Sequence, residues 1–496
     1  MQLKDLLSTV SYLDLQLIPD MKVSGVKVDS RRVLRGDLFL ALPSVSGLDV
    51  DAHVKEAHEK GAGVIVCEEA TYNVFSGEVD SCALIRVEDA RLAYAQIAAH
   101  LFPRQPRHMA AVTGTNGKTS AVYFFRQICE MLGSTAATLG TLGLQAPVAW
   151  ASDIKTHLTS PDPFTLHATL GNLLDEGVEY VAVEASSHGL EQKRLDGVSF
   201  QVGAFTNLSH DHLDYHGSIQ NYFDAKKRLF EEVLDPGFTA VINADDFHSE
   251  QLLRICHDRQ HKIYTYGRRA QEMCIHEVTL TETGQTVSVD FFGHTYEISL
   301  PLVGAFQAYN VLCAAGMACG VGFNPKDVVE TLGRLVSVPG RVQYIGSTKK
   351  GGRVYVDYAH TPHALESVLT SLKPHVKNLL VLVFGCGGNR DKEKRGQMGR
   401  IAAEHAQRVI ITDDNPRHED AATIRAQIIK ECPGALELPD RAQAIMAAIK
   451  SLGEHSICVI AGKGHESGQI VGDTILPFDD AHVAREILQE LEGSIA

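Results

Sequence analysis

The sequence predicts an α/β protein of three domains: a small N-terminal α/β domain, a central P-loop ATPase-like parallel sheet and a C-terminal Rossmann-like α/β domain. A chain of 496 residues is too long for one ordinary core, and at roughly 150 residues per domain its length indicates about three. Apolar runs of strand length alternate with helical patterns, as a doubly wound parallel sheet requires. A glycine-rich turn joins one such run to an amphipathic helix at residues 111–120. We expect the domains at 1–100, 107–338 and 339–496.

The composition excludes several classes of protein. A formal net charge of −15 disfavours nucleic acid as a partner, because binding a phosphate backbone requires a basic face. No run of about 18 apolar residues could span a bilayer, and the N-terminus lacks the features of a signal peptide, so we expect a cytoplasmic protein without membrane insertion. The ten cysteines occur singly with no C-x-x-C pair, which favours reduced core thiols over disulfides or structural zinc.

The N-terminal hundred residues have alternating and apolar runs typical of short strands, at 26–31 and 36–42. Within the first run, Asp29 and Ser30 favour a simple turn, since this domain alone carries no catalytic signal. Two prolines in the polar stretch 101–107 indicate a linker before the next domain.

The glycine-rich turn has the features of a phosphate-binding loop. Small residues allow backbone N–H groups to converge on an anion at the start of a helix, while Lys118 offers a charge to the β- and γ-phosphates and Thr119 a hydroxyl to Mg²⁺. Apolar residues at helical spacing follow as far as Gly133, which should cap the helix. Val112 replaces the glycine of the usual P-loop spacing, so the loop is a shortened variant; the alternative is an incidental glycine-rich turn. The expected ATP-binding residues of this loop are Gly114, Thr115, Asn116, Gly117, Lys118, Thr119 and Ser120.

Three further strands of the central domain end in polar loops, at 184–189, 206–212 and 243–246. Because parallel strands end at the same edge of a sheet, we expect these loops and the phosphate loop to share one crevice. Glu184 stands where a carboxylate for the nucleotide's Mg²⁺ would lie, and the alternative is a solvated strand end.

Two charged segments follow in the same domain. The run 210–216 contains three histidines and two aspartates, and a polar loop in which one imidazole assists a Mg²⁺ site is favoured over a zinc centre. Residues 222–230 have the pattern of an amphipathic helix, in which spacing alone places both Lys226 and Lys227 on the surface.

The last domain repeats the pattern of a strand followed by a polar loop, at 357–362, 385–392, 412–417 and 461–466. By the same rule these loops should form a second crevice, rich in both charges. Arg390, Arg417 and Glu466 together suit a zwitterion, because guanidinium forks bind carboxylates and a carboxylate binds an ammonium.

Six of these segments resemble the Mur ligase family. They are 114–119, 184–190, 211–217, 357–362, 414–417 and 462–466, and the last two are typical of the MurE type. The resemblance covers nearly the whole chain and implies three domains that bind a UDP-linked substrate, ATP and an incoming amino acid. The chain departs from the family pattern at Ser160, Gln307 and Asn389, where a threonine, an asparagine and an aspartate are commoner.

The resemblance also implies a role for individual residues, and it reverses the surface position that spacing gives Lys226. The implied catalytic residues are Lys118, Glu184, His212 and Lys226, with magnesium near Thr119, Glu184, His212 and a carbamylated Lys226. Those for the UDP substrate are Val28 and Ser30 at the uridine end, and Thr159, Ser160, Ser186, Gln192 and Arg194 at the muramoyl dipeptide. Asn310 and Arg341 would contact ATP. Those for the amino acid are Arg390, Asp414, Asn415, Pro416, Arg417, Gly462 and Glu466.

The implied function is an ATP-dependent ligation in peptidoglycan biosynthesis. ATP would phosphorylate the D-glutamate γ-carboxylate of a UDP-N-acetylmuramoyl dipeptide, and the amine of the amino acid would attack the acyl phosphate. A guanidinium fork from Arg417 favours meso-diaminopimelate, which has a second carboxylate; the alternative is that Arg417 pairs with a local carboxylate such as Glu419. Other functions left open are the same ligation with L-lysine, a folylpolyglutamate synthetase-like ligase, and a nucleotide-switched module that binds a muropeptide without ligating it.

Overall fold

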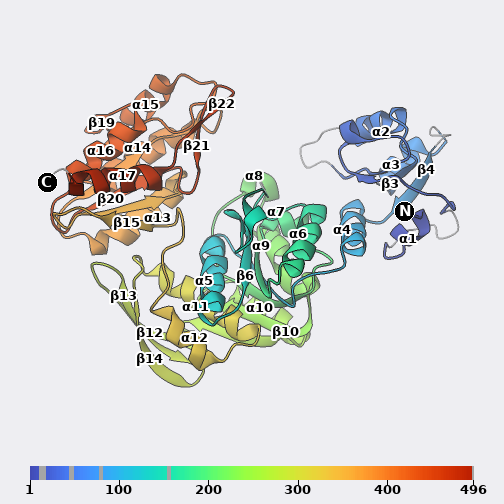
Figure 1. The fold of residues 1–496 in the computed structure, drawn as a ribbon, viewed down its shortest axis with the longest axis horizontal. Coiled ribbons are helices and arrows are strands. Elements are labelled where there is room, and N and C mark those ends of the chain that lie inside the picture. Colours follow the sequence, from blue (N-terminus) through green and yellow to red (C-terminus); the bar gives the residue numbers. More distant parts are fainter. Residues whose placement is uncertain (11–17, 44–49, 78–81, 154–157, 494–496) are drawn as a thin grey trace.

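The computed structural model describes residues 1–10, 18–43, 50–77, 82–153 and 158–493. Three parallel-rich sheets follow one another along the chain, and Figure 1 shows the N-terminal and C-terminal sheets on opposite sides of the central one. The predicted α/β fold is confirmed. The ten cysteines are free thiols, most of them buried. Within the described ranges, no helix has the length and apolar character needed to cross a membrane.

The N-terminal unit is a small parallel sheet with helices on both faces. Its elements are α1 (Leu3–Leu6), β1 (Val26–Lys27), η2 (Ser30–Arg32), β2 (Leu38–Leu40), α2 (Val50–Glu59), β3 (Val64–Glu68), α3 (Glu69–Phe75), β4 (Ala83–Val87) and α4 (Ala90–Leu101), with strand order β1-β2-β3-β4. Side chains that alternate along β2 and β3 enter two cores, with Leu38 and Val64 on one face and Phe39 and Ile65 on the other.

The first predicted strand of this unit, over 26–31, is only two residues long. Asp29 ends it by capping the short helix η2, since its carboxylate accepts a hydrogen bond from Arg31 N (3.1 Å). A short 3₁₀ helix therefore stands where the sequence favoured a simple turn.

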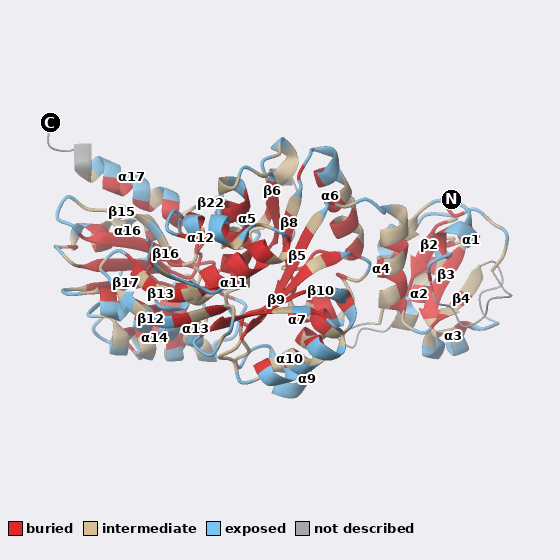
Figure 2. Ribbon diagram, turned by 90° about the horizontal axis from the view of Figure 1, so that it is seen from below, coloured by how far each residue is buried: buried red, intermediate tan, exposed pale blue. Residues whose placement is uncertain are grey.

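The central unit is a ten-stranded sheet between two layers of helices. Its first elements are β5 (His108–Thr113), α5 (Lys118–Met131), β6 (Ala136–Gly140), β7 (Gly143–Gln145), η3 (Ala149–Asp153), α6 (Pro163–Asp175), β8 (Tyr180–Glu184), α7 (Ser187–Glu191) and β9 (Phe200–Phe205). They are followed by α8 (Leu213–His216), α9 (Ile219–Arg228), η4 (Leu229–Val233), β10 (Leu234–Asn243), α10 (Ser249–Asp258) and β11 (Lys262–Gly267). The unit ends with β12 (Met273–Leu280), β13 (Gln285–Phe291), β14 (His294–Leu300), α11 (Phe306–Gly320) and α12 (Pro325–Leu332). Figure 2 shows the central strands buried between the helical layers.

The strand order places the predicted loops of the central unit together. The order is β14-β13-β12-β11-β10-β9-β5-β8-β6-β7, so the four strands β10, β9, β5 and β8 are adjacent, and they are parallel. Their carboxyl ends therefore share one edge, as expected from the sequence. Helices α5 and α11 pack on one face of the sheet, and α6, α9 and α10 pack on the other.

The C-terminal unit is a six-stranded sheet that also contains four adjacent parallel strands. Its first elements are β15 (Gln343–Ser347), β16 (Arg353–Asp357), α13 (Pro362–Leu372), η5 (Lys373–His375), β17 (Leu380–Phe384), α14 (Glu393–His405) and β18 (Arg408–Ile411). The others are α15 (Ala421–Ile429), β19 (Leu436–Glu437), α16 (Arg441–Lys450), β20 (Ile457–Ala461), β21 (Gly468–Val471), β22 (Thr474–Pro477) and α17 (Asp480–Gly493). The strand order is β15-β16-β20-β17-β18-β19. The four strands that precede the predicted polar loops, β16, β20, β17 and β18, are therefore adjacent, and they are parallel.

Candidate functional site

The phosphate loop lies between β5 and α5, where the sequence places it. Gly114 and Gly117 have φ angles of 145° and 87°, which favour glycine. A Cβ at Gly114 would lie 1.9 Å from Thr206 Oγ1, and one at Gly117 would lie 2.4 Å from Asn310 Oδ1. Both glycines therefore allow a close approach that a side chain would prevent, and Asn310 is brought to the loop as expected. The Lys118 ammonium donates hydrogen bonds to two carbonyl oxygens of its own loop, at 2.8 and 2.9 Å.

Glu184 is a buried carboxylate beside this loop. Its side chain is 1% exposed, so the alternative of a solvated strand end is wrong. Oε2 accepts hydrogen bonds from the hydroxyls of Thr119 (3.1 Å) and Thr141 (3.1 Å), and Oε1 accepts one from Thr141 N (2.8 Å). These donors compensate for the burial of a charge. A hydroxyl and a carboxylate that face each other next to a phosphate loop offer the oxygen ligands that Mg²⁺ prefers.

Lys226 lies in the core of the site and not on the surface that spacing predicted. It projects from α9, is 1% exposed, and its Nζ lies 4.3 Å from the centre of the Tyr222 ring and donates a hydrogen bond to Gly114 O (2.8 Å). Burial, together with the nearby Lys118 cation, holds the pKa of Lys226 well below its ordinary value. Lys227, one position on, pairs with Asp224 at 3.2 Å and is about one-quarter exposed.

His212 lies at the edge of this group, half exposed and with a φ of 51°. Its ring centre is 4.9 Å from that of His188 and 6.2 Å from that of Tyr222, whose hydroxyl donates to Thr115 Oγ1 (3.2 Å). Burial and the neighbouring histidines lower the pKa of His188 to about 4, so that ring is neutral at physiological pH.

Asp211 is a charged residue of this site that the sequence reasoning did not select. Burial lowers the pKa values of both Lys118 and Lys226, and the Asp211 carboxylate opposes this effect because it favours their charged forms. The signal was present, because Asp211 precedes His212 in the motif that was recognised.

The serines assigned to the UDP substrate are connected directly to Glu184. The Ser160 hydroxyl donates to Glu184 O (2.7 Å), lies 3.0 Å from the Ser186 hydroxyl and accepts a hydrogen bond from Ser186 N (3.0 Å). Thr159 Oγ1 lies 3.5 Å from Thr141 Oγ1, which itself donates to Glu184. The Ser160 hydroxyl is thus fully used in hydrogen bonds.

Arg194 and Gln192 extend this hydrogen-bond network away from the phosphate loop. Arg194 donates to Ser160 O (3.0 Å) and to Gln192 Oε1 (2.6 Å), and Gln192 Nε2 donates to the Tyr215 hydroxyl (3.0 Å). The structure therefore brings five of the seven residues assigned to the UDP substrate into one group beside Glu184.

The other two, Val28 and Ser30, lie apart from that group in the N-terminal unit. Val28 is exposed, whereas Ser30 is buried and donates a hydrogen bond to Glu56 Oε2 (2.5 Å). A substrate that contacts both groups must extend from the N-terminal sheet to the edge of the central one.

Arg341 connects the central crevice with the C-terminal one. Its guanidinium lies 4.7 Å from the centre of the Tyr358 ring. Burial lowers the pKa of Lys118, and the Arg341 charge lowers it further. The preceding residue, Gly340, accepts a hydrogen bond from Tyr358 N (2.9 Å), and a Cβ there would lie 2.6 Å from His465 N. The nucleotide loop and the loops at 357–362 and 461–466 are therefore close in space.

The two arginines of the second crevice flank Gly387. A Cβ at Gly387 would lie 2.8 Å from Arg417 Nη1 and 3.9 Å from Arg390 Cγ. Arg417 has a φ of 51°, and its guanidinium donates to Gly388 O (3.0 Å). Its backbone is held by the β21–β22 hairpin, through Arg417 N to Ile470 O (3.0 Å). Arg417 does not pair with Glu419, so that alternative is wrong.

Glu419 instead pairs with Arg395, which is completely buried on α14. Arg395 donates to both carboxylate oxygens of Glu419 (3.1 Å each) and to Gly387 O (3.2 Å), and Asn389 N donates to Glu419 Oε1 (2.5 Å). Asn389 Oδ1 accepts a hydrogen bond from His418 N (3.1 Å). This ion pair holds the loops that carry Arg390 and Arg417 against each other.

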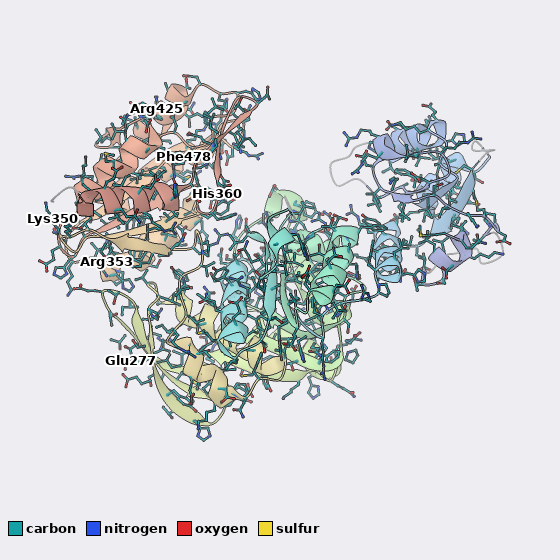
Figure 3. All side chains as sticks on the ribbon, in the orientation of Figure 1. Glu277, Lys350, Arg353, His360, Arg425 and Phe478 are labelled. Atoms are coloured by element: carbon teal, nitrogen blue, oxygen red, sulfur yellow. The ribbon has the colours of Figure 1, made fainter. Side chains whose placement is uncertain are left out.

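Two more arginines support the ends of the neighbouring strands. Arg425, labelled in Figure 3, pairs with Asp413 and with Glu437 (2.7 Å). Arg441 pairs with Asp480 through two 2.7 Å contacts and donates to Ala461 O (2.9 Å), at the start of the loop at 461–466. The sequence reasoning missed Arg395, Arg425 and Arg441, because nothing in their local sequence distinguishes them from surface charges.

The remaining residues assigned to the amino acid form a compact polar group. Asn415 Nδ2 donates to Glu466 Oε2 (2.9 Å), and the buried Lys463 donates to Asn415 Oδ1 (3.0 Å) and to Glu466 Oε2 (3.1 Å). Asp414 is buried, and burial raises the pKa of its carboxyl group. The positive charges of Arg441 and Lys463 oppose this rise. Both contacts of Glu466 use one oxygen, and the side chain is about one-third exposed.

Gly462 and Pro416 set the backbone around that polar group. A Cβ at Gly462, whose φ is 112°, would lie 2.7 Å from Asp414 Oδ2. A Cβ on Gly388 would lie only 1.9 Å from Pro416 O, so the two loops are in close contact. Lys463 was not selected from the sequence, although it lies inside the recognised segment 462–466.

Comparisons with known proteins identify the family of the chain. The profile of the Mur ligase middle domain matches residues 112–318, and that of the Mur ligase glutamate ligase domain matches 340–464. Two curated relatives, from Agrobacterium fabrum (strain C58) and Caulobacter vibrioides, are each 44% identical over 96% of this chain, and the matches cover 95% and 96% of the relatives. Both relatives are named UDP-N-acetylmuramoyl-L-alanyl-D-glutamate--2,6-diaminopimelate ligase. A solved structure of an enzyme with that name is 30% identical, with a TM-score of 0.71 and 99% coverage of both chains.

Replacing Gly140 by alanine tests the packing around Glu184. The new Cβ would lie 2.1 Å from Glu184 Oε1, so the carboxylate or the strand must move. We expect a loss of about 1–3 kcal/mol, typical of overpacking, measured by urea unfolding. Gly434→Ala is the matched control, because its Cβ would meet nothing within 4 Å and should cost less than about 0.5 kcal/mol. Equal losses in the two variants would contradict the tight packing of Glu184.

Proposed function

The chain belongs to the Mur ligase family, and from that premise we propose that it adds meso-2,6-diaminopimelate to UDP-N-acetylmuramoyl-L-alanyl-D-glutamate, with hydrolysis of ATP to ADP and phosphate, in peptidoglycan synthesis. The observation that carries this proposal is the network that joins the phosphate loop, Glu184, Ser160 and Arg194. A phosphoryl donor and a carboxylate acceptor would meet across it. The substrates are metabolites of the cytoplasm, where we place the reaction.

In the first step, the γ-carboxylate of D-glutamate attacks the γ-phosphorus of ATP. One oxygen–phosphorus bond forms, the bond to the ADP oxygen breaks, and an acyl phosphate results. The backbone N–H groups of the phosphate loop and Lys118 hold the phosphates, and Asn310 and Arg341 hold the rest of the nucleotide. Thr159, Ser160, Ser186, Gln192 and Arg194 orient the muramoyl dipeptide, and Val28 and Ser30 hold its uridine end. Such positioning converts two bound molecules into one reacting unit.

The residues present fit both Mg²⁺ and a carbamate. Thr119 Oγ1 and Glu184 Oε2 lie 3.1 Å apart, and both are oxygen atoms of the kind that Mg²⁺ binds. A carbamate forms when a neutral amine adds to CO₂ and releases a proton, and burial favours the neutral amine of Lys226. We infer that Thr119, Glu184, His212 and a carbamylated Lys226 hold the metal, whose charge stabilises the transferred phosphoryl group when it is bound.

In the second step, the amine of diaminopimelate attacks the acyl carbon, a C–N bond forms, phosphate leaves and the nitrogen loses a proton. The loops with Asp414, Asn415, Pro416, Gly462 and Glu466 would hold the amino-acid end of the substrate. Arg417 and Arg390, which flank Gly387, would bind the distant carboxylate. L-Lysine lacks that carboxylate and would leave the guanidinium unpaired.

The proposal is tested by measuring phosphate release with defined sets of substrates. Release should require ATP, the UDP-muramoyl dipeptide and diaminopimelate together, because the acyl phosphate is consumed only by the amine. Release with a folate substrate and glutamate would indicate a folylpolyglutamate synthetase-like ligase. Nucleotide binding that responds to the muropeptide, with no amide product under any condition, would indicate a binding module.

Lys226→Arg tests the carbamate. A guanidinium keeps a long basic side chain at this position but cannot form the carbamate, so turnover should fall roughly 100-fold or more, as for the loss of one preorganised catalytic contact. Lys227→Arg, the adjacent and partly exposed lysine, should keep near-normal turnover. Circular dichroism checks that both variants fold. Normal turnover of Lys226→Arg would exclude the carbamate.

Arg417→Ala tests the choice of amino acid. The wild type should prefer diaminopimelate to L-lysine by about 30-fold or more in kcat/KM, which corresponds to roughly 2 kcal/mol for a charged hydrogen bond. The variant should lose most of this preference, while Arg400→Ala, an exposed arginine that pairs with Glu431, should retain it. A wild type that prefers lysine, or a variant that keeps the preference, would show that Arg417 is not the selector.

A further inference from the structure

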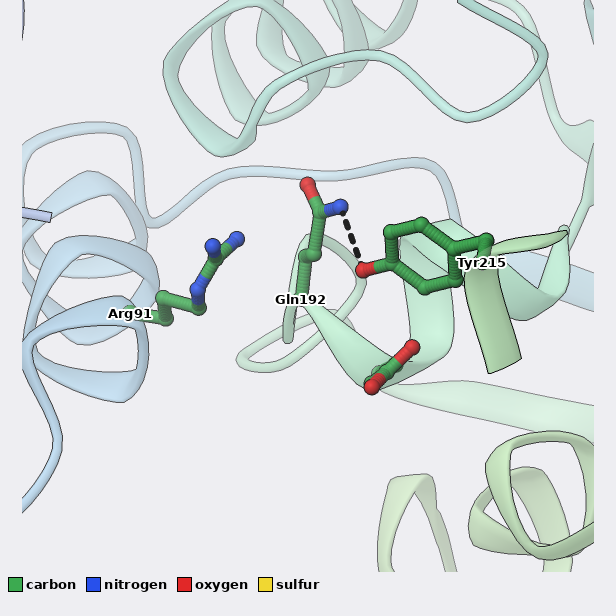
Figure 4. A pocket seen from close by; sticks show the side chains of 4 residues that line it. Arg91, Gln192 and Tyr215 are labelled. Carbon is green, nitrogen blue, oxygen red and sulfur yellow. Dashed lines mark hydrogen bonds between the residues drawn. The ribbon is translucent and has the colours of Figure 1, made fainter. Parts of the chain in front are cut away.

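A cavity of about 290 Å³ lies where the N-terminal unit meets the central one. Four residues line it: Arg91 from α4, Glu191 at the end of α7, Gln192 directly after that helix, and Tyr215 from α8. Of these residues only Gln192 is assigned to a substrate by the resemblance. Figure 4 shows the Arg91 side chain extending from its helix toward Gln192.

Two guanidinium groups lie near this cavity, and the hydrogen bonds that they donate go to uncharged acceptors. Arg91 donates to Pro43 O (2.7 Å), and Arg194 donates to Ser160 O and to Gln192 Oε1. Burial first, and the Arg91 charge next, lower the pKa of Arg194, so the two cations act on each other. Among the residues that the structure describes, neither one forms an ion pair with a carboxylate. Glu191, the acid of the cavity, lies 3.4 Å from His216 instead.

The position of the cavity indicates which molecule would supply the missing negative charge. The residues assigned to the uridine end lie in the N-terminal unit, and those assigned to the dipeptide lie beside Glu184. The part of the substrate between these ends must cross the junction of α4 and α7, where Arg91 is fixed by Pro43. A guanidinium offers several donors in one plane, which match two oxygens of a phosphate or carboxylate group.

We propose that Arg91 is a further substrate-binding residue, which binds an anionic group of the UDP-linked substrate, either the diphosphate or a carboxylate of the dipeptide, in the cavity with Gln192 and Tyr215. This role rests on the proposed function, since it takes the UDP-muramoyl dipeptide as the ligand. It adds a contact from the N-terminal unit to the group that orients the dipeptide.

Steady-state kinetics of Arg91→Gln, Arg91→Lys and the control Arg35→Gln test the role. Arg91→Gln should raise KM for the UDP-muramoyl dipeptide about tenfold or more, with kcat and the KM values for ATP and diaminopimelate within about twofold of the wild type. Arg91→Lys should recover part of the loss, because it keeps the charge without the fork. Arg35 is an exposed arginine of the same unit, and its variant should behave as the wild type.

Calorimetric titration identifies the anionic group and needs no turnover. If Arg91 binds the diphosphate, Arg91→Gln loses affinity for UDP but not for UMP. If it binds a carboxylate, the variant binds UDP and UMP normally and loses affinity for the UDP-muramoyl dipeptide relative to UDP-N-acetylmuramate without the dipeptide. Wild-type affinity for all four ligands would overturn the inference. So would an equal loss for all four with a lower unfolding temperature, which indicates a structural role. A wild type that neither binds nor consumes the dipeptide would overturn the proposed function instead.

Discussion

The buried carboxylate of Glu184 is the interaction on which the rest of the central site depends. An ionised carboxylate removed from water is stable only if hydrogen-bond donors replace the lost hydration. Here the donors come from the phosphate helix, through Thr119, and from the segment after β6, through Thr141. The backbone oxygen of Glu184 also accepts from Ser160. One residue thus ties the nucleotide loop to the group assigned to the acceptor substrate.

The charges around Glu184 explain why two lysines, the partly buried Lys118 and the buried Lys226, can lie at the same edge of the sheet. Lys118 and Lys226 both donate hydrogen bonds to Gly114 O, and the Lys118 charge disfavours a charge on Lys226. Asp211 and Glu184 favour the charge on Lys118, whereas only Asp211 is a significant opposing charge for Lys226. The two lysines therefore differ in their chemistry. Lys118 suits phosphate binding, and Lys226 suits reaction as a neutral amine.

Much of the fold was predictable because it depends on local patterns. Apolar runs followed by polar loops located the strands of both crevices, and glycine spacing located the phosphate loop. The position of Lys226 was not predictable from periodicity, since it depends on Gly114, 112 residues earlier in the chain. Arg395 and Arg91 were missed for the same reason: their partners Glu419 and Pro43 lie 24 and 48 residues away. The resemblance to a family corrected the predicted position of Lys226, because family motifs mark residues that meet in the fold although they are far apart in the sequence. It gave no signal for the two arginines.

The central claim is that phosphoryl transfer to the substrate carboxylate takes place across the network at Glu184. It is tested most directly with a UDP-muramoyl dipeptide whose D-glutamate γ-carboxylate carries ¹⁸O. If an acyl phosphate forms, one labelled oxygen must leave with the phosphate when the amine attacks, and mass spectrometry of the released phosphate should show one ¹⁸O per turnover. Amide product accompanied by unlabelled phosphate would contradict the account.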